Sequence, residues 1–365
     1  MYYFILFLNI MFLYILREKK KITFNIGKYN VEKVDLDQLF FSVIILIWIF
    51  VFTLKSLEIG TDVRMYEYMY KTAYTYVENK NVFNIGVFNQ PLYYYIFWVL
   101  SKIMKFPYRT ALFLIYSFSL FSIWYFVMKR TENRTFCIFM LMCSGFFWFC
   151  MSAIRQTMAI SIGLFAIDYL MEKKYIRFFI GVIMSVMIHR TAVILLLILF
   201  IVKINDDGKN SAIIIALSSV IAFIIPTNIV SYLVSAFNYT DYEDNVGISS
   251  SILMMLVYVA VATFIVVVNY KREKCRNDMV GIYMLFSFMI LFSSKFYLLS
   301  RVAYYVIVPA YIYITNKISE FCKNDYKLLF DFIIILMILW MVIPLRNNPL
   351  NVMPYRFYWK NGEVW

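Results

Sequence analysis

Residues 152–200 read SAIRQTMAISIGLFAIDYLMEKKYIRFFIGVIMSVMIHRTAVILLLILF, and this stretch indicates the class of fold. Two apolar segments, at 154–171 and 176–200, flank the short basic turn EKKYIR, and each is close to the roughly 20 residues that a helix needs to cross a bilayer. Arg155 and Gln156 open the first segment, whereas His189, the only histidine in the chain, interrupts the second together with Arg190. Because a cation inside or at the edge of a membrane span is energetically costly, such residues suggest a functional role.

The rest of the chain has the same apolar character. Hydrophobic residues make up 63% of the 365 residues and the mean hydropathy is +0.72, whereas a soluble globular domain is about 45–50% apolar. The repeated apolar runs predict an all-α, polytopic integral membrane protein with about 10–12 transmembrane or re-entrant helices. We expect residues 1–365 to form a single membrane-embedded domain, with the apolar start as its first span rather than a signal peptide, because a basic leader and a small-residue cleavage site are both missing.

The formal charge of +13 indicates topology and not nucleic-acid binding. More than half of the 35 Lys and Arg residues fall in five short segments between apolar runs, namely 17–38, 129–134, 172–177, 271–278 and 316–327. Basic loops between spans are typical of the cytoplasmic side of a membrane. We therefore expect these segments to be cytoplasmic, and we expect no nucleic-acid partner.

Spans expected at about 2–16, 39–55, 110–128, 135–150 and 302–315 are among those that this pattern indicates, and counting them places both termini outside the cytoplasm. Residues 56–109 become an extracellular loop, in which the apolar run 91–104 is too short to cross and favours an interfacial or re-entrant helix. Residues 346–365 become an extracellular tail. One of the segments 176–202 and 211–237 must fail to make a simple crossing, and both contain polar interruptions that would allow re-entry where they line a protein cavity.

This topology brings several polar segments to one face of the membrane. They are Asp62 with its neighbours Gly60, Thr61 and Arg64, then Arg155 with Gln156, Lys295 with Arg301, and Tyr355 with Arg356. Several cations above a hydrophobic body suit a lipid-linked, negatively charged substrate, because the planar guanidinium engages phosphate oxygens in pairs. A nearby carboxylate could take a proton from a sugar hydroxyl as it attacks.

Each of these residues also has a plainer interpretation. Asp62 could only cap a helix that begins near Val63, and Arg155 could reach toward the lipid head groups. His189 could close an internal hydrogen bond, Arg301 could anchor its helix at the interface, and Tyr355 and Arg356 could pin the tail to the surface.

The remaining motifs predict little chemistry. The pair Asp35 and Asp37 matches the metal-binding DxD of nucleotide-sugar transferases, but it lies outside any α/β domain, and we interpret it as a solvated loop. The five cysteines show no CxxC spacing and are expected to be free thiols. We expect no cofactor and assign no metal ligand.

Four segments together resemble the EpsG family of exopolysaccharide and capsule polymerases, which is related in role to Wzy polymerases. They are GTDVRMYEYMY at 60–70, IRQTMAISIGLFAI at 154–167, IHRTAVILL at 188–196 and VMPYRFYW at 352–359. The resemblance covers most of the chain in the same order, and it rests on the ordered combination because each motif is short. Arg190 departs from the small or polar residue expected beside His189.

The resemblance implies a GT-C-like membrane glycosyltransferase in the bacterial cytoplasmic membrane, joining undecaprenyl-diphosphate-linked oligosaccharide repeats at the outer face. Its partners would be that lipid-linked oligosaccharide, membrane lipid and other polysaccharide-assembly proteins. Motif by motif, the resemblance implies roles for Asp62, Arg155, His189 and Arg356, with Asp62 or His189 as the catalytic base. The predicted topology adds Gln156, Arg301 and Tyr355 to the residues expected to bind the substrate.

Two other functions remain open at this point. A lipid-linked oligosaccharide flippase also needs a cationic cavity, but an internal repeat and midplane charges in both halves, which are typical of such transporters, are not evident. A membrane ligase or acyltransferase acting on surface glycan is the other alternative.

Overall fold

The computed structural model describes residues 2–18, 21–22, 25–26, 29–30, 34–79, 90–203, 279–293, 298–322, 331–339, 341 and 350–361. The chain divides into two compact units, Met1–Val193 with Ile318–Trp365, and Ile194–Lys317. Among the described residues, every regular element apart from two short strand pairs is helical. The predicted all-α class of a polytopic membrane protein is therefore confirmed.

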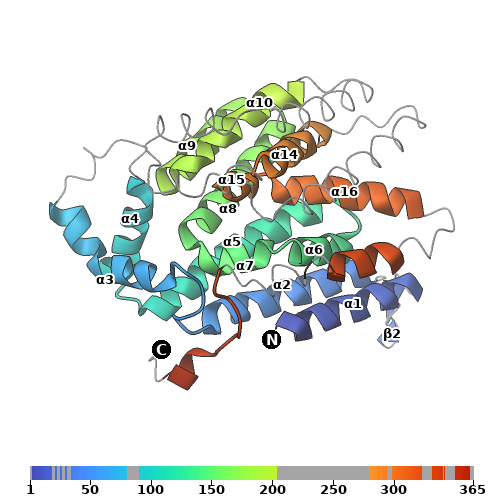
Figure 1. The fold of residues 1–365 in the computed structure, drawn as a ribbon, viewed down its shortest axis with the longest axis horizontal. Helices are drawn as coiled ribbons and strands as arrows, with labels where there is room; N and C mark the ends of the chain where they lie inside the picture. Colours follow the sequence, from blue (N-terminus) through green and yellow to red (C-terminus); the bar gives the residue numbers. More distant parts are fainter. Residues whose placement is uncertain are drawn as a thin grey trace. The chain divides into compact units, whose positions relative to one another are not determined.

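Three helices form the centre of the first unit: α2 (Leu36–Leu54), α5 (Tyr108–Arg130) and α8 (Ile154–Met171) (Figure 1). α2 and α5 are antiparallel, because Trp124 near the end of α5 donates to Ser42 Oγ near the start of α2 at 2.9 Å. α5 and α8 run in the same direction, since Lys129 lies 2.6 Å from the Asp168 carboxylate near the end of α8. The relative directions match those in the predicted topology.

Among the described residues, α2 and α5 are the helices long and apolar enough to cross a membrane. A third span would be the pair α6 (Arg134–Cys143) and α7 (Phe146–Ser152), which bend by 67° at Gly145. Gly145 has φ of +80°, a backbone conformation that glycine adopts readily. These helices correspond to the spans expected at 39–55, 110–128 and 135–150.

Buried aromatic side chains fill the space between α2, α5 and α7. Trp48 stacks on Phe147 with ring centroids 4.7 Å apart, and Phe52 meets the edge of Tyr116 at 5.0 Å. Within a membrane, helices gain little from hydrophobic burial against one another, so close van der Waals packing of this kind holds them together.

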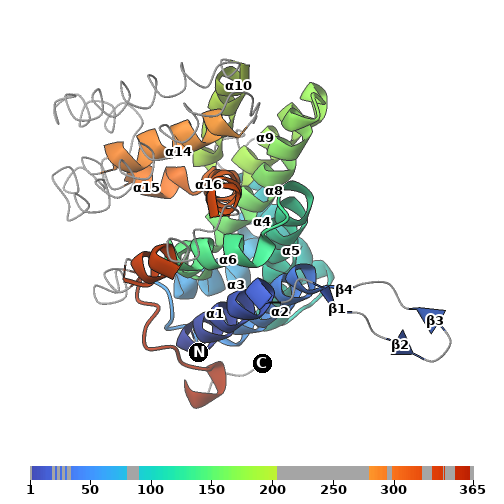
Figure 2. The same ribbon diagram turned by 90° about the vertical axis from the view of Figure 1, so that its right-hand side faces the viewer.

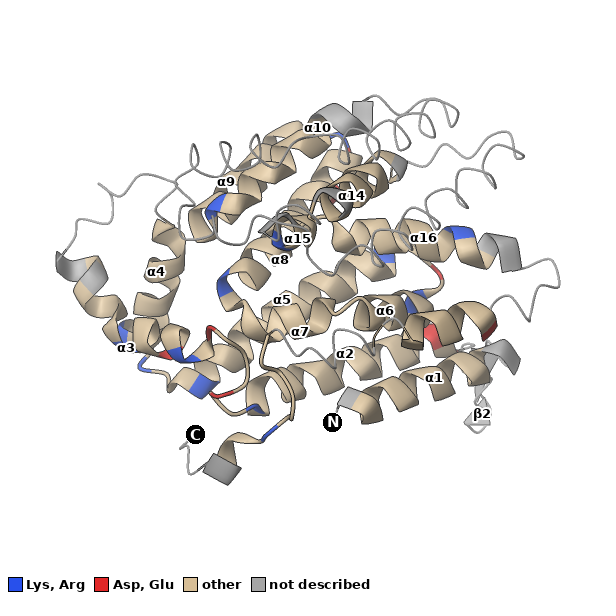
Figure 3. Cartoon of the chain, viewed as in Figure 1, with Lys and Arg blue, Asp and Glu red and all other residues tan. Residues whose placement is uncertain are grey.

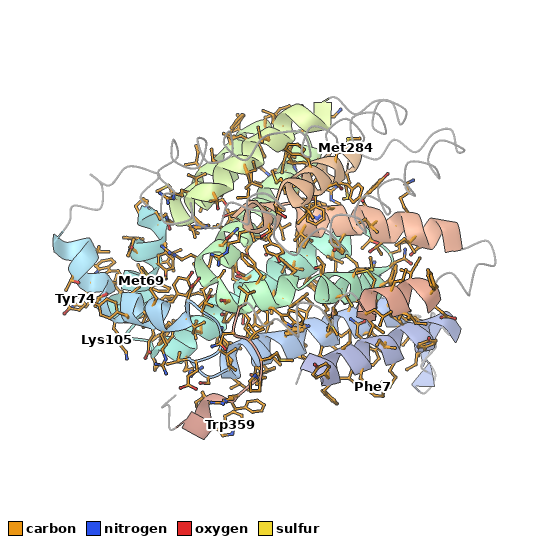
Figure 4. All side chains as sticks on the ribbon, in the orientation of Figure 1. Phe7, Met69, Tyr74, Lys105, Met284 and Trp359 are labelled. Atoms are coloured by element: carbon orange, nitrogen blue, oxygen red, sulfur yellow. The ribbon has the colours of Figure 1, made fainter. Side chains whose placement is uncertain are left out.

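The N-terminal helix α1 (Tyr2–Glu18) packs against α2 and α6. Phe7 lies on its outer side, 64% exposed, and points away from the neighbouring helices (Figure 4). Two antiparallel strand pairs follow, β1 (Lys21–Ile22) with β4 (Val34–Asp35) and β2 (Asn25–Ile26) with β3 (Tyr29–Asn30). They extend away from the helices of this unit (Figure 2).

α9 (Tyr175–Ile188) returns along α8 as a tight helical hairpin. A Cβ placed on Gly181 would lie 2.8 Å from the Ala166 Cβ, and Ser185 Oγ donates to Ala159 O at 2.6 Å. α9 ends at His189, whose backbone is extended, and the 3₁₀ turn η4 (Arg190–Ile194) follows. The expected interruption at His189 is thus confirmed, whereas 211–237 lies outside the described residues.

Two helices lie in the segment expected to be a loop: α3 (Val63–Asn79) and α4 (Pro91–Trp98), the latter continuing as the π-helical turn η3 (Val99–Ile103). They pack on each other through buried rings, such as Tyr70 against Phe97 at 5.3 Å. Neither meets the length and apolarity of a span. Their location at an interface stays a prediction, as does the single membrane domain.

The second unit contains α10 (Leu195–Lys203), α14 (Val280–Phe292), α15 (Leu298–Ala303) and α16 (Ile307–Cys322), the last up to Lys317. The rings of Tyr283 and Tyr313 join α14 to α16, with centroids 5.5 Å apart. The span expected at 302–315 begins later in the structure, because a turn at 304–306 separates α15 from α16. Helical residues 331–339 belong to the first unit.

Candidate functional site

The charged residues of the central helices lie close to the helix ends, and the middles of these helices are nearly free of charged residues (Figure 3). We call the end formed by residues 35–37, 129–135 and 168–174 the ion-pair end. The opposite end, formed by residues 55–62, 107–109, 151–156 and 350–358, is called the site end, because it holds most of the candidate residues from the sequence.

At the ion-pair end, Asp35 and Asp37 have structural roles. Asp35 caps α2 by accepting from the Asp37 N–H at 3.1 Å. The Asp37 carboxylate accepts from the backbone N–H groups of Arg134 at 2.8 Å and Thr135 at 3.0 Å, so it caps the start of α6. The solvated-loop interpretation of this DxD sequence was therefore wrong for Asp37, because its carboxylate supplies hydrogen bonds that a helix start lacks.

The same end holds an ion-pair network between α5 and the end of α8. Asp168 is buried and pairs with both Lys129 and Arg130, and Lys129 also pairs with Glu172. Hydrogen bonds from Lys129 and then Lys174 lower the pKa of Glu172 from 4.5 to about 2. Each cation of this network therefore has an anionic partner.

At the site end, Gly60 anchors the loop 55–62 against the break between α7 and α8. Its φ is +98°, and an added Cβ would lie 3.0 Å from the Ser152 Cα. The next residue, Thr61, donates its N–H to Ser152 Oγ at 3.1 Å, and the two hydroxyl oxygens are also 3.1 Å apart. The loop therefore rests directly on the residues that precede α8.

Asp62 follows in this loop and is half-buried. Its carbonyl accepts from the Tyr66 N–H at 3.1 Å, which is the first hydrogen bond of α3. Asp62 thus occupies the capping position that the sequence allowed, next to the contact of Thr61 with Ser152. Its role in chemistry stays a prediction.

The C-terminal tail also joins the site end, as the sequence predicted for Tyr355 and Arg356. The backbone N–H of Ser56 donates to Arg356 O at 2.8 Å, and Tyr355 Oη donates to Val51 O at 2.8 Å. Burial raises the pKa of the Tyr355 phenol. Arg356 itself is exposed, 3.4 Å from the carboxylate of Glu58.

Glu58 is shared by a second arginine. Arg64 lies 3.0 Å from the other carboxylate oxygen, so both exposed guanidinium groups have the same anionic partner. Asn351 of the tail donates to Glu58 O at 3.2 Å and accepts from the Gly60 N–H at 3.0 Å. The tail and the loop are therefore cross-linked along their length.

Arg155 is the half-buried cation of the site end. It is the second residue of α8, and its guanidinium lies 5.5 Å from the ring centroids of both Tyr66 and Tyr93. Its Nη1 donates to the side-chain oxygen of Gln90 at 3.1 Å. Within the described part of the chain, these partners are all neutral. Arg155 therefore differs from the cations of the ion-pair end, which face carboxylates.

The α8–α9 hairpin brings the end of α9, which His189 follows, toward the start of α8, which carries Arg155. Ser185 in the last turn of α9 donates to Ala159 O in the second turn of α8. His189 is half-buried, and its backbone N–H donates to Ser185 O at 2.9 Å. Gln156 is buried next to Arg155 in the first turn of α8.

Sequence reasoning missed two buried cations at the site end, Lys55 and Arg109. Lys55 directly follows α2 and donates to Met151 O, whereas Arg109 opens α5 and donates to Thr53 O at 3.1 Å and to Lys55 O. A signal was present, since both residues stand at span ends on the same predicted face as Arg155.

For two candidate residues, a place at this site stays a prediction. Arg301 lies in α15 of the second unit, and Lys295 lies outside the described residues. Among the residues that the structure describes, His, Cys, Asp and Glu form no group of three that could hold a metal ion.

The sequence model of the EpsG family matches residues 38–357. The matched range starts in the first turn of α2 and ends in the tail, so it contains the site end except for Tyr358. No curated protein and no solved structure matches the chain.

Proposed function

This chain belongs to the EpsG family, which is linked to exopolysaccharide synthesis, and on this basis we propose that it is a membrane glycosyltransferase. It joins undecaprenyl-diphosphate-linked oligosaccharide repeat units into exopolysaccharide or capsule. The reaction takes place at the outer face of the cytoplasmic membrane, and the GT-C-like character implied by the resemblance belongs to the same proposal.

The observation that supports this most is the environment of Arg155. A half-buried guanidinium whose described partners are the amide of Gln90 and the faces of two tyrosines keeps its full charge. Burying such a charge is costly unless an anion approaches it. The start of α8 adds the partial positive charge of a helix N-terminus. A diphosphate group is the anion that this pair of features would bind.

The proposed reaction exchanges one bond for another. The oxygen of an acceptor hydroxyl bonds to the anomeric carbon of the donor sugar, while the bond from that carbon to the diphosphate oxygen breaks. The electron pair leaves with undecaprenyl diphosphate, whose charge Arg155 stabilises. The hydroxyl proton passes to a base, for which we favour Asp62 over His189, because the loop of Asp62 is tied to Ser152 beside the start of α8.

The orientation follows from the charges of the opposite end. The ion-pair end carries the basic segments 129–134 and 172–177, which the positive-inside rule places in the cytoplasm. The site end would then face outward, where lipid-linked repeats are joined.

The test combines deletion in the native host with one substitution. Deletion is expected to abolish long polymer and leave single lipid-linked repeats outside the membrane, whereas repeats trapped inside would indicate a flippase. Arg155→Lys keeps the charge but loses the paired donors, so elongation by the purified protein should fall roughly 10- to 100-fold, the loss of a hydrogen bond to a charged group.

Arg177→Lys is the matched control for that substitution. Arg177 also lies over a tyrosine ring, at 5.7 Å from Tyr169, but it stands on the exposed part of α9 near the ion-pair end. Its elongation rate should equal that of the native protein. Equal rates for Arg155→Lys and Arg177→Lys would contradict the proposed diphosphate contact.

A further inference from the structure

A buried lysine contacts the break between α7 and α8. Lys55 is fully buried, and its ammonium donates to the carbonyl oxygen of Met151, the residue next to Ser152 at the end of α7. Tyr116 Oη donates to the same carbonyl at 3.2 Å, and its ring centroid lies 5.5 Å from Lys55 Nζ. Two donors from two different helical regions therefore meet at one backbone oxygen.

These contacts stabilise both the carbonyl at the end of α7 and the buried ammonium group of Lys55. The carbonyls in the last turn of a helix lack helical partners and carry partial negative charge. An ammonium group removed from water needs such partners, because a buried charge without them is strongly unfavourable. The Met151 carbonyl and the Lys55 ammonium therefore stabilise each other, and moving the carbonyl would leave the buried ammonium without this partner.

The same lysine is fixed through its backbone. Arg109 donates to Lys55 O and to Thr53 O, and its guanidinium lies 4.8 Å from the ring centroid of Tyr358 in the tail. The backbone of Lys55 also forms an antiparallel bridge with Phe357. The lysine therefore stands where α2, the start of α5 and the tail meet.

The loop that begins at Lys55 returns to the same helix break. The side chain of Lys55 contacts Met151, and six residues later Thr61 contacts Ser152. Arg155 follows within the first turn of α8. A shift of the Met151 carbonyl would consequently move Ser152 away from Thr61 and turn the start of α8, which carries the guanidinium.

We propose that Lys55 is a positioning residue of the site: its ammonium fixes the Met151 carbonyl at the α7–α8 break, which holds Ser152 against Thr61 and aims Arg155 at an anionic diphosphate. The positioning role deepens the proposed function and rests on it for its catalytic consequence. The geometric part can be tested without any polymerase activity.

The geometric test measures how readily a disulfide forms between positions 61 and 152. In a cysteine-free background, Thr61→Cys with Ser152→Cys should crosslink readily, because the two native hydroxyl oxygens are only 3.1 Å apart. Adding Lys55→Met, which keeps the length of the side chain but removes its charge, should abolish most of this crosslink. Lys105→Met is the matched control, since Lys105 is exposed in the turn before α5 (Figure 4).

The kinetic test compares the same substitutions in the cysteine-containing protein. Lys55→Met should lower kcat for elongation by roughly 10- to 100-fold per folded molecule, the cost of a misplaced reacting group, with a smaller change in KM for the lipid-linked donor. Tyr116→Phe removes the second donor to Met151 O without changing the packing volume, so it serves where Lys55→Met does not fold. It should shift crosslinking and kcat in the same direction, by less.

The outcomes separate the inference from the proposed function. Loss of crosslinking together with a lower kcat supports the positioning role. Native crosslinking in Lys55→Met and Tyr116→Phe overturns it, whatever the kinetics, and so does loss of crosslinking with native kcat. If the native protein makes no polymer from the donor, the proposed function fails, and the crosslinking ratio alone still decides whether Lys55 holds the break.

Discussion

Replacing Gly60 by alanine is expected to displace the loop 55–62 from the start of α8. Gly60 has φ of +98°, and an alanine Cβ would lie 2.9 Å from the Val63 Cγ2 and 3.0 Å from the Ser152 Cα. The second contact is with backbone, which a rotamer change cannot relieve. The positive φ costs roughly 1–2 kcal/mol for an L-residue, and overpacking of this kind costs typically about 1–3 kcal/mol. We therefore expect Gly60→Ala to lose about 2–5 kcal/mol of stability.

Two other glycines separate these contributions. Gly145 has φ of +80°, but its added Cβ would meet only Trp148, at 3.6 Å, so Gly145→Ala should show the conformational cost alone. Gly181 lies inside α9 and would meet Ala166 at 2.8 Å. Gly181→Ala should show the steric cost, reduced by the 0.5–1 kcal/mol or so that alanine gains over glycine in a helix. Gly60→Ala should therefore be the least stable of the three.

The three variants are heated in the same detergent, and thermal unfolding is monitored as the fraction of protein that remains monodisperse at each temperature. Elongation activity of the folded fraction is measured in parallel, and only Gly60→Ala should lower it, because only that change moves Thr61 from Ser152. If Gly60→Ala unfolds at the same temperature as Gly145→Ala, the close approach to Ser152 does not exist as described, and the reasoning fails.

Three further predictions concern the base, the ion-pair end and the orientation. If Asp62 is the base, Asp62→Asn should abolish elongation with donor binding intact and His189→Gln should cost less; robust elongation by Asp62→Asn would exclude proton transfer to that carboxylate. Because the folded pKa of Glu172 is lowered from 4.5 to about 2, its contribution to stability is complete above pH 4.5 and is lost as the pH falls toward 2. The stability difference between the native protein and Glu172→Gln should shrink over that range, and a constant difference would refute the pairing with Lys129 and Lys174. Single cysteines at positions 105 and 173 should be labelled from outside and only after permeabilisation, respectively, and the reverse pattern would invert the proposed orientation.

Much of the first unit could be predicted from hydrophobic runs and loop charges. The expected spans at 39–55, 110–128 and 135–150 agree with α2, α5 and the α6–α7 pair, because each run has the length that a membrane crossing imposes. The 67° bend at Gly145 was not predicted. A glycine within an apolar run does not reveal whether its φ is positive, since that depends on what packs around the turn.

Some residues of the candidate site could be predicted from the sequence and others could not, for a similar reason. The polar residues at span ends include Thr61, Arg155 and Tyr355, which lie at one end of the central helices because alternating spans bring every second loop to the same face. Lys55 and Arg109 were overlooked because a basic residue at the end of a span usually reaches toward lipid head groups. Their actual partners are backbone carbonyls at helix ends, and a sequence does not show which carbonyls a tertiary fold leaves without hydrogen bonds.

The two ends of the first unit use their cations in different ways, and the difference bears on function. At the ion-pair end, Lys129 and Arg130 share the buried carboxylate of Asp168 and Lys129 also pairs with Glu172, so each cation faces an anion within the protein. At the site end, Lys55 binds a carbonyl, and the described partners of Arg155 are likewise neutral. A cation–π contact contributes about 0.5–2 kcal/mol, whereas removing a charged group from water costs several times more. Among the described residues of the first unit, this deficit stands at the site end, which supports the proposal that an anion binds there, and the amide end of α8 beside Arg155 adds to that support.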